Sequence, residues 1–377
     1  MTSLHISSQF DSGNITVLNK ENPESIQLAI KTDVESGFYQ WFHFRVNGAQ
    51  DMPLGLHITN APGASYAEGW EDYRAVASYD REEWFRVDTS YNGSELVIHH
   101  TPECNTVYYA YFAPYSMERH HDLIAWAQQS ASATVETLGD TLDGQPLDMV
   151  KIGSGDNKKV CWVIGRQHPG ETMAQWWMEG FLQRMLDPAC PVARELLKKA
   201  VFYLVPNMNP DGSRRGHLRS NACGANLNRE WAEPSAARSP EVLLVRNKMD
   251  ETGVDFCLDV HGDEALPYNF IAAAEGIPSW TDRLRHLTDS YRDALMKASP
   301  DFQTAVGYPV DEPGKANMTV CSNALAERFD CLALTLEMPF KDTLQTPDEE
   351  QGWSPERAKV LGTANLDAIY AVVDQLR

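Results

Sequence analysis

The sequence predicts an α/β fold for the last two thirds of the chain and an antiparallel β-sandwich for the first third. In the later part, short apolar runs alternate with segments of helical periodicity, which is typical of α/β domains. In the first part, short β-type runs are separated by Gly, Pro, Asn and Asp, with no helical segment between them. At 377 residues the chain is long enough for two cores. We therefore predict a β-sandwich domain at residues 1–115 and an α/β domain at residues 116–377.

The predicted strands of the first domain are five runs rich in β-branched and aromatic residues. They cover residues 40–48, 54–59, 84–87, 95–100 and 106–112. Pro114-Tyr-Ser-Met117 marks the junction, and a helix is predicted to begin near Glu118. The junction is short and poor in Gly and Ser, so we expect the two domains to pack together.

The second domain contains four apolar runs of five or six residues that read as buried strands, and one clear helix beside them. The predicted strands are residues 160–165, 200–205, 256–260 and 331–336, and the predicted helix covers residues 173–186. In an open α/β sheet, ligands bind at the carboxyl ends of the strands. Polar side chains that follow these runs are therefore candidates for a functional site.

Two imidazoles and a carboxylate follow two of these strands. His168 and Glu171 lie in the loop after residues 160–165, and His261 comes directly after residues 256–260. A His and a Glu three residues apart occur often by chance, but here two separate segments deliver ligand-type side chains to the same sheet edge. Zinc accepts this donor set and keeps a fourth position for water. The sequence therefore predicts a hydrolytic site with one Zn²⁺ ion.

Glu337 ends the fourth predicted strand, residues 331–336, which is too apolar to be an exposed edge. Its carboxylate could simply emerge into solvent. Beside a zinc ion, however, an acid in this place is expected to act as a general base that takes a proton from water and passes it to a leaving amine.

Arginines concentrate in residues 214–229, although the whole protein carries a net charge of −21. The planar guanidinium suits a carboxylate or a developing oxyanion, so we expect Arg219 and Arg229 to hold the anionic end and the reacting carbonyl of a substrate.

The overall negative charge disfavours nucleic acid and anionic membranes as partners. No apolar run approaches the ~20 residues of a membrane span. Seven cysteines without paired spacing, and no signal peptide, indicate reduced thiols and a cytoplasmic protein.

The motifs of residues 117–377 resemble those of the zinc metallocarboxypeptidases, and specifically of the cytosolic carboxypeptidase subfamily. The motifs that carry this resemblance are His168-Pro-Gly-Glu171, Asn209-Pro-Asp-Gly212, Gly216-His-Leu-Arg219, Leu227-Asn-Arg229, Asp259-Val-His261 and Thr335-Leu-Glu337. The amino-terminal part is also similar, because this subfamily has a β-sandwich with a Trp-Phe-x-Phe-Arg-Val-like strand.

The resemblance implies a three-layer α/β/α fold on a mixed sheet and an enzyme that hydrolyses the carboxyl-terminal residue of peptides or proteins. It assigns His168, Glu171 and His261 as ligands of one zinc ion, Glu337 as the general base, Arg219 as the group that polarises the scissile carbonyl, and Asn228 with Arg229 as the clamp on the terminal carboxylate. The subfamily also implies removal of acidic residues, as in deglutamylation. An acid-specific pocket needs a cation, for which the candidates are Lys315, Arg328, Lys341 and Arg215.

Two positions depart from the family pattern. The family commonly has Asp-Leu-Asn-Arg, whose Asp accepts a hydrogen bond from a zinc-bound imidazole, whereas here that position is Asn226. An uncharged acceptor leaves the imidazole less basic. Secreted members also use a mobile Tyr before the catalytic Glu. Tyr308 is the nearest candidate, and we interpret it as a structural loop residue.

Two other functions fit parts of the pattern. An N-acyl amino acid amidohydrolase of the aspartoacylase type shares the His-x-x-Glu, the Asn-Arg pair and a later His. The sequence Asn209-Pro-Asp-Gly212 and the β-sandwich favour the peptidase. A non-catalytic binding protein on a peptidase scaffold would need a ligand or the base to be missing, and the sequence has all of them.

Overall fold

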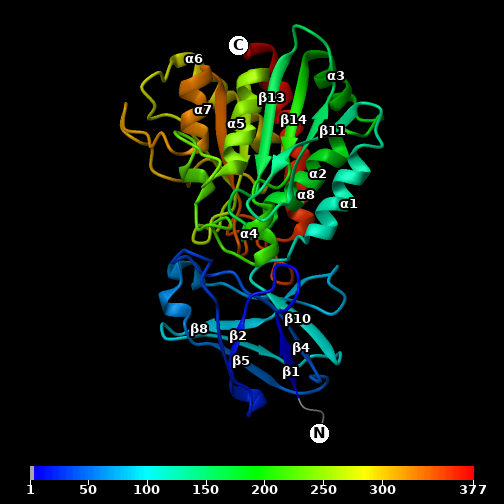
Figure 1. Cartoon of the computed structure of the whole chain (residues 1–377), viewed down its shortest axis with the longest axis vertical. Helices are drawn as coiled ribbons and strands as arrows, with labels where there is room; N and C mark the ends of the chain where they lie inside the picture. The colour runs from blue at the N-terminus through cyan, green and yellow to red at the C-terminus, as the bar shows by residue number, and fades with distance from the viewer. Residues whose placement is uncertain (1–3) are drawn as a thin grey trace.

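The computed structural model describes residues 4–377, which form a β-rich unit and an α/β unit packed against each other (Figure 1). The β-rich unit contains the amino-terminal strands, and the α/β unit begins with a helix at Met117. The boundary itself, between residues 115 and 116, stays a prediction. Within residues 4–377, no helix has the length and apolarity required to cross a membrane.

The β-rich unit is a sandwich of two five-stranded sheets. The strands of the first sheet, in spatial order, are β1 (His5–Ser7), β4 (His43–Asn47), β10 (Thr106–Ala110), β6 (Val76–Ser78) and β7 (Phe85–Arg86). Those of the second are β2 (Thr16–Asn19), β3 (Ile26–Ala29), β5 (Leu54–Ile58), β9 (Leu96–His100) and β8 (Asp88–Tyr91). Three short 3-10 helices also belong to this unit, at Pro23–Ser25, Ala61–Gly63 and Ala67–Trp70.

The pairing in this sandwich is antiparallel as predicted, with one exception. Strands β3 and β5 are parallel, with Ile26 opposite Leu56 and Leu28 opposite Ile58. The chain between them passes through β4 in the other sheet, and such a long crossover lets it return in the same direction. The inward-facing side chains of both sheets, such as Leu28, Leu56 and Phe44, are fully buried in one core.

The α/β unit is built on a seven-stranded mixed sheet. Its strands in spatial order are β11 (Ala133–Asp140), β12 (Pro146–Ile152), β14 (Ala200–Val205), β13 (Lys159–Gly165), β15 (Phe256–Val260), β17 (Leu332–Glu337) and β16 (Phe270–Ala273). The four central strands, from β14 to β17, are parallel, while β11, β12 and β16 pair in the antiparallel sense. All four strands predicted for this domain are present, with ends within one residue of those expected.

Helices cover both faces of this sheet, so the predicted three-layer α/β/α architecture is confirmed (Figure 1). On β13, Cys161 and Val163 pack into one core, and Trp162 and Ile164 into the other. The helices of the first face are α1 (Met117–Ala127), α2 (Met173–Met185), α3 (Pro191–Lys199), α6 (Asp282–Ala298) and α8 (Pro355–Val372). Those of the second face are α5 (Pro240–Thr252) and α7 (Cys321–Phe329). Short helices at α4 (Pro210–Arg215), Leu227–Arg229 and Val373–Gln375 complete the unit.

The parallel strands bring three chain segments to one edge of the sheet. Gly165, at the end of β13, lies opposite Val260, at the end of β15, and Val260 lies opposite Leu336 on β17. The residues that follow these strand ends therefore meet beside one another. Helix α4 lies at the junction with the β-sandwich, so this edge faces the amino-terminal unit (Figure 1).

Candidate metal centre

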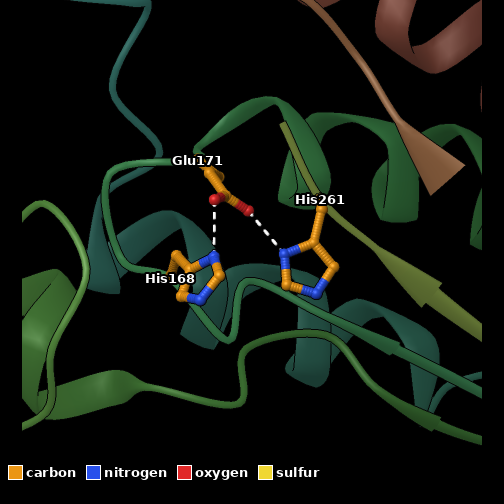
Figure 2. A group of neighbouring side chains, drawn as sticks. All are labelled: His168, Glu171 and His261. Carbon is orange, nitrogen blue, oxygen red and sulfur yellow. Dashed lines mark hydrogen bonds and ion pairs between the residues drawn. The ribbon is translucent and has the colours of Figure 1, made fainter. Parts of the chain in front are cut away.

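Three buried side chains point their donor atoms toward one another at this edge (Figure 2). Glu171 Oε1 lies 2.6 Å from His168 Nδ1, and Glu171 Oε2 lies 2.8 Å from His261 Nδ1. His168 and Glu171 occupy the turn between β13 and α2, and His261 directly follows β15. The structure thus brings together the three residues that the sequence singled out as metal ligands.

The donor set and its spacing suit a small divalent cation. One donor atom from each residue can be chosen so that all lie within 4.8 Å of one another. Zinc with tetrahedral bonds near 2.1 Å holds its ligands about 3.4 Å apart. The two contacts of Glu171 are shorter than this, so small movements of the side chains accommodate one ion.

The three groups have pKa values that differ strongly from their ordinary ones. Burial, with Arg219 adding to it, lowers the pKa of His168 to about 4. Burial acts the same way on His261, but Asp259 and Glu171 outweigh it and raise the pKa of this imidazole. The two imidazoles likewise outweigh burial at Glu171 and lower the pKa of its carboxyl. Glu171 is therefore ionised and His168 neutral at physiological pH, which are the forms that bind metal, whereas His261 must give up a proton to bind an ion.

Each imidazole has a hydrogen-bond acceptor on its far side. His168 Nε2 lies 3.0 Å from Asn226 Oδ1, and His261 Nε2 lies 2.9 Å from Asp259 Oδ2. Each acceptor can take a hydrogen from Nε2, and the tautomer with hydrogen on Nε2 is the one that presents Nδ1 to an ion. Asn226 thus makes the contact that the sequence predicted, and the two rings have unequal partners, one neutral and one charged.

Glu337 ends β17 beside this group and is 6% exposed. Its Oε2 has no hydrogen-bond partner within residues 4–377. Burial, reinforced by Glu171 and by two further acids, raises the pKa of Glu337 well above its ordinary value despite the opposing effect of His261. Buried polar atoms in proteins are nearly always paired, so a carboxylate oxygen left free at a cleft indicates a partner supplied by a ligand or by water.

A cleft of about 670 Å³ extends from these residues and also contains the predicted substrate-binding groups. The side chain of Arg219 forms no hydrogen bond or ion pair within the described chain. Asn228 accepts a hydrogen bond from Cys321 N at its Oδ1, which directs the opposite end of the amide, Nδ2, toward His261. Arg229 is exposed, and its guanidinium donates 2.7 Å to the Asn228 carbonyl.

Several residues that line the cleft were not predicted from the sequence. Tyr66 and Glu68 come from the amino-terminal unit, and Asp263 and Glu264 closely follow His261. Asp263 and Glu264 could have been found from the sequence, because two adjacent acids lie close to the predicted ligand His261. Tyr66 and Glu68 could not, because their position at the cleft depends on how the two units pack.

Tyr308 also lines the cleft. Its hydroxyl donates a 2.6 Å hydrogen bond to Asp263 Oδ2, and its ring packs edge-on against Phe270 at 4.9 Å. Burial, reinforced by Glu337 and Asp263, raises the pKa of this phenol. The interpretation of Tyr308 as a structural loop residue is therefore incomplete, since the residue faces the reacting region.

The four cations proposed for an acid-specific pocket lie outside the cleft, so that prediction was wrong. Arg215 and Arg328 form ion pairs with Asp143 and Asp250, Lys341 donates to the Glu71 carbonyl, and Lys315 is exposed. The third arginine of the cleft wall, besides Arg219 and Arg229, is Arg292, which pairs with Glu275 at 3.1 Å.

Comparisons with known proteins agree with this geometry. A family model described as cytosolic carboxypeptidase N-terminal domain matches residues 6–112, and one described as zinc carboxypeptidase matches residues 122–365. A metallo-carboxypeptidase from Burkholderia cenocepacia has 46% identity and a TM-score of 0.97, covering 99% of this chain and 100% of its own. A metallo-carboxypeptidase from Pseudomonas aeruginosa, solved in complex with (2-guanidinoethylmercapto)succinic acid, has 44% identity and a TM-score of 0.96, with 99% and 100% covered.

More distant relatives include mammalian proteins. Cytosolic carboxypeptidase 6 of Mus musculus is 26% identical over 296 residues, or 70% of this chain. This chain spans 54% of the length of that protein, so the mouse protein has further regions without a counterpart in the match.

Proposed function

The chain belongs to the zinc carboxypeptidase family and is a metallocarboxypeptidase that uses one zinc ion, and we propose that it removes single residues from the carboxyl terminus of peptides or proteins in this cleft. The observation that carries the proposal is the buried group of His168, Glu171 and His261 beside the unpartnered Oε2 of Glu337. We propose the first three as the zinc ligands and Glu337 as the general base.

Asn228 and Arg229 would hold the terminal carboxylate of the substrate. The Asn228 amide donor, Nδ2, faces the cleft, and the neighbouring guanidinium offers a planar pair of N–H groups for the carboxylate. Fixing the carboxylate here sets the distance to the last peptide bond, so that this bond alone reaches the metal-site residues. An exopeptidase results because an internal segment has no carboxylate for this clamp.

Hydrolysis then requires a nucleophile, an electrophile and a proton carrier. Zinc, when bound, lowers the pKa of a water molecule and polarises a carbonyl oxygen. Arg219, whose guanidinium forms no hydrogen bond or ion pair within residues 4–377, stabilises the charge that develops on that oxygen. Glu337 takes the proton from the attacking water and delivers it to the departing amino nitrogen as the C–N bond breaks. The products are a shortened peptide with a new carboxylate and a free amino acid.

Glu337→Gln tests the assigned base. The amide keeps the shape of the side chain but cannot accept the proton, so kcat should fall about 10²–10⁴-fold or more while zinc content stays at one ion per chain. Turnover is measured with a good peptide substrate, and zinc by elemental analysis. Near-normal kcat in this variant would show that another group carries the proton.

The clamp is tested with substrates and with Arg229→Ala. A peptide amide lacks the terminal carboxylate and should resist cleavage that the free acid undergoes. The variant should raise KM more than it lowers kcat, because the clamp binds substrate and transition state alike.

Two outcomes would favour other functions. Hydrolysis of N-acetyl or N-succinyl amino acids without any peptidase activity would favour the aspartoacylase-type alternative. A chelator-insensitive protein without hydrolysis would favour a binding role.

Terminal Glu or Asp is our first proposal for the residue removed, on the likeness to the cytosolic subfamily, with Arg292 as the cation. A basic terminal residue is the second candidate, since acids outnumber arginines on the cleft wall and the Arg292 charge is opposed by Glu275. The ligand of the Pseudomonas aeruginosa relative also carries a guanidinium group.

Matched peptides that end in Glu, Lys or Phe separate these two candidates. Preference for Glu that is lost in Arg292→Gln supports the acidic pocket, and preference for Lys supports the basic one. Equal kcat/KM for all three would contradict both.

We also propose that the protein acts in the cytoplasm on peptide or protein chains. The names of the mammalian relatives and the seven free cysteines support this setting.

A further inference from the structure

A single carboxylate of the amino-terminal unit holds the backbone of the loop that carries Arg219. Asp33 is 2% exposed, and its Oδ1 accepts a 2.7 Å hydrogen bond from Leu218 N. Its Oδ2 accepts from Arg219 N at 2.9 Å, from Ser220 N at 2.9 Å and from Ser220 Oγ at 2.8 Å. Three consecutive amides are thereby fixed by one side chain that lies 185 positions or more away in sequence.

The residues that follow Asp33 also pack closely against the loop that carries Arg219. Val34 N donates to His217 Nε2 at 3.2 Å, and His217 Nδ1 in turn donates to the Ser220 carbonyl at 3.0 Å. Gly224 has a φ of +78°, and a Cβ there would lie 2.3 Å from the Glu35 carbonyl oxygen. The segment that begins at Asp33 therefore fits against residues 217–224 with no room for a larger side chain.

Two aromatic rings of the same unit flank the guanidinium itself. The Arg219 Cζ lies 5.6 Å from the centre of the Phe38 ring and 5.5 Å from that of the Tyr66 ring. A ring face attracts a cation without occupying its N–H groups. A carboxylate partner would instead have neutralised the charge and used the donors. This environment holds the side chain while keeping all its donors available to a substrate oxygen.

The Arg219 loop is also joined to the metal centre. Gly170, between the two proposed ligands of the β13–α2 turn, donates from its backbone N to the Leu218 carbonyl at 2.8 Å. A Cβ at Gly170 would lie 2.9 Å from that same oxygen. A shift of the Arg219 loop would therefore change the distance between the guanidinium and the ligands on which the carbonyl polarisation depends.

We propose that Asp33, Phe38 and Tyr66 are positioning residues for Arg219, so that the amino-terminal β-sandwich completes the oxyanion-stabilising part of the active site. This inference rests on the proposed function, in which Arg219 stabilises the developing charge on the scissile carbonyl. Preorganised donors are effective only when they stay within hydrogen-bond distance of the oxyanion, and errors near 1 Å cost on the order of 10²-fold in rate.

A double-mutant cycle tests the proposal in the full-length, zinc-loaded protein. Asp33→Ala should lower kcat about 10–100-fold with KM changed less than about threefold, because the terminal-carboxylate clamp is untouched. In an Arg219→Ala background, the same change should lower kcat by less than about twofold, because Asp33 acts through Arg219. Equal losses from Asp33→Ala in both backgrounds would overturn the inference, since they indicate a general structural role.

Asp11 provides a matched control. Its Oδ2 accepts a 2.9 Å hydrogen bond from Met117 N of α1, so it is another carboxylate of the amino-terminal unit that bonds to a backbone amide beyond the junction, but not to residues 217–220. Asp11→Ala should leave kcat within about twofold of wild type. A loss equal to that of Asp33→Ala would overturn the inference, because any weakening of the junction would then suffice.

Milder variants keep the proposal testable if Asp33→Ala does not fold. Asp33→Asn retains one acceptor oxygen, and Phe38→Leu retains apolar bulk but removes a ring face. Each should lower kcat about 2–10-fold with zinc content and the unfolding midpoint near wild type. If Arg219→Ala lowers kcat but neither milder variant does, the inference fails and the proposed function stands. If Arg219→Ala has no effect on kcat, the role of Arg219 in the proposed function fails, and the inference fails with it.

Discussion

Asn226 gives one of the two imidazoles a neutral acceptor, whereas the other imidazole donates to the charged Asp259. A charged acceptor raises the basicity of the ring and orients it, and loss of such a partner typically weakens metal affinity 10–100-fold. We therefore expect the uncharged partner to make zinc binding at the proposed ligand His168 weaker than a charged partner would.

Asn226→Asp should tighten zinc binding, and Asn226→Ala should weaken it about 10–100-fold. The dissociation constant is measured by competition with a chromophoric chelator. An Asp variant with unchanged or weaker affinity would show that the charge of the acceptor does not tune this site.

Glu241 predicts a pH dependence of stability. It is fully buried at the start of α5, where Asn221 Nδ2 donates to its Oε2 at 3.3 Å, and burial raises its pKa from 4.5 to about 7. The folded state therefore retains a proton that the unfolded state loses, so its stabilising contribution is complete below pH 4.5 and disappears as pH rises through 7. The full difference is about 3 kcal/mol.

Glu241→Gln should remove this dependence. Between pH 5 and pH 8, the free energy of unfolding of the variant should rise relative to wild type at the same zinc concentration, as followed by urea denaturation. The exposed Glu21→Gln serves as a control that should keep the wild-type slope. Parallel pH profiles for wild type and Glu241→Gln would contradict the assignment.

At the residue level, the sequence was sufficient to place the side chains that directly follow buried strands. It was not sufficient for side chains whose partners are distant in sequence. His168, Glu171, His261 and Glu337 were placed together because parallel strands end at one edge. Arg215 failed as a pocket cation because its partner, Asp143, is remote in sequence and no local pattern reports the pair.

Among the elements, α2 and α8 pack with very close backbones. A Cβ at Gly180 would lie 2.2 Å from the Lys359 carbonyl oxygen, and one at Gly362 would lie 2.1 Å from the Trp177 carbonyl oxygen. Because each glycine has no Cβ, the backbone of the other helix can approach it closely. Since α2 begins just after Glu171, this crossing also fixes the helix that follows the metal-site turn.

Gly180→Ala or Gly362→Ala should destabilise the protein by about 1–3 kcal/mol or more, because the added methyl group overpacks a rigid contact. Guanidinium chloride denaturation measures the loss. Gly37→Ala is the control, because a Cβ there has no neighbour within 4 Å. Helix variants as stable as this control would show that the two helices can separate without cost.

The positions of the strands were predicted well, because they follow from the pattern of apolar residues. The pairing of strands was predicted less well, because it depends on the path of the chain between them. The apolar runs at β13, β14, β15 and β17 match the structure because strands buried on both faces leave a continuous signal. The parallel pairing of β3 with β5 was missed, since it depends on which sheet the intervening chain joins. The cleft contribution of Tyr66 was missed because it depends on the packing of two domains.

Across the whole molecule, Arg86 links the two units. This arginine of β7 is 7% exposed and donates to the carbonyls of Phe340 at 2.8 Å, Trp353 at 2.9 Å and Gln351 at 3.2 Å, all in the α/β unit. Burial lowers its pKa to about 10, so it stays charged at neutral pH. We expect the two units to unfold together because their contact includes this buried hydrogen-bonded cation.

Arg86→Met should leave these carbonyls unpaired and destabilise the protein by about 3 kcal/mol or more. Calorimetry should show one transition for wild type, and a lower midpoint or two transitions for the variant. Arg194→Met is the control, because this exposed arginine donates to the Pro188 and Ala189 carbonyls within its own unit. A variant at position 86 that melts like the control would show that the junction does not depend on this side chain.

The burial of the Glu337 carboxyl at the cleft means that the resting protein is less heat-resistant than its fold allows. Burying an ionisable group costs more free energy than burying an apolar group of similar size, and active sites often retain such local conflicts in exchange for chemistry. Glu337→Met, which fills the same volume with apolar atoms, should therefore melt at a higher temperature than wild type while being inert as a peptidase. The enzyme and its most durable version would then differ at the carboxylate that we propose to carry the proton.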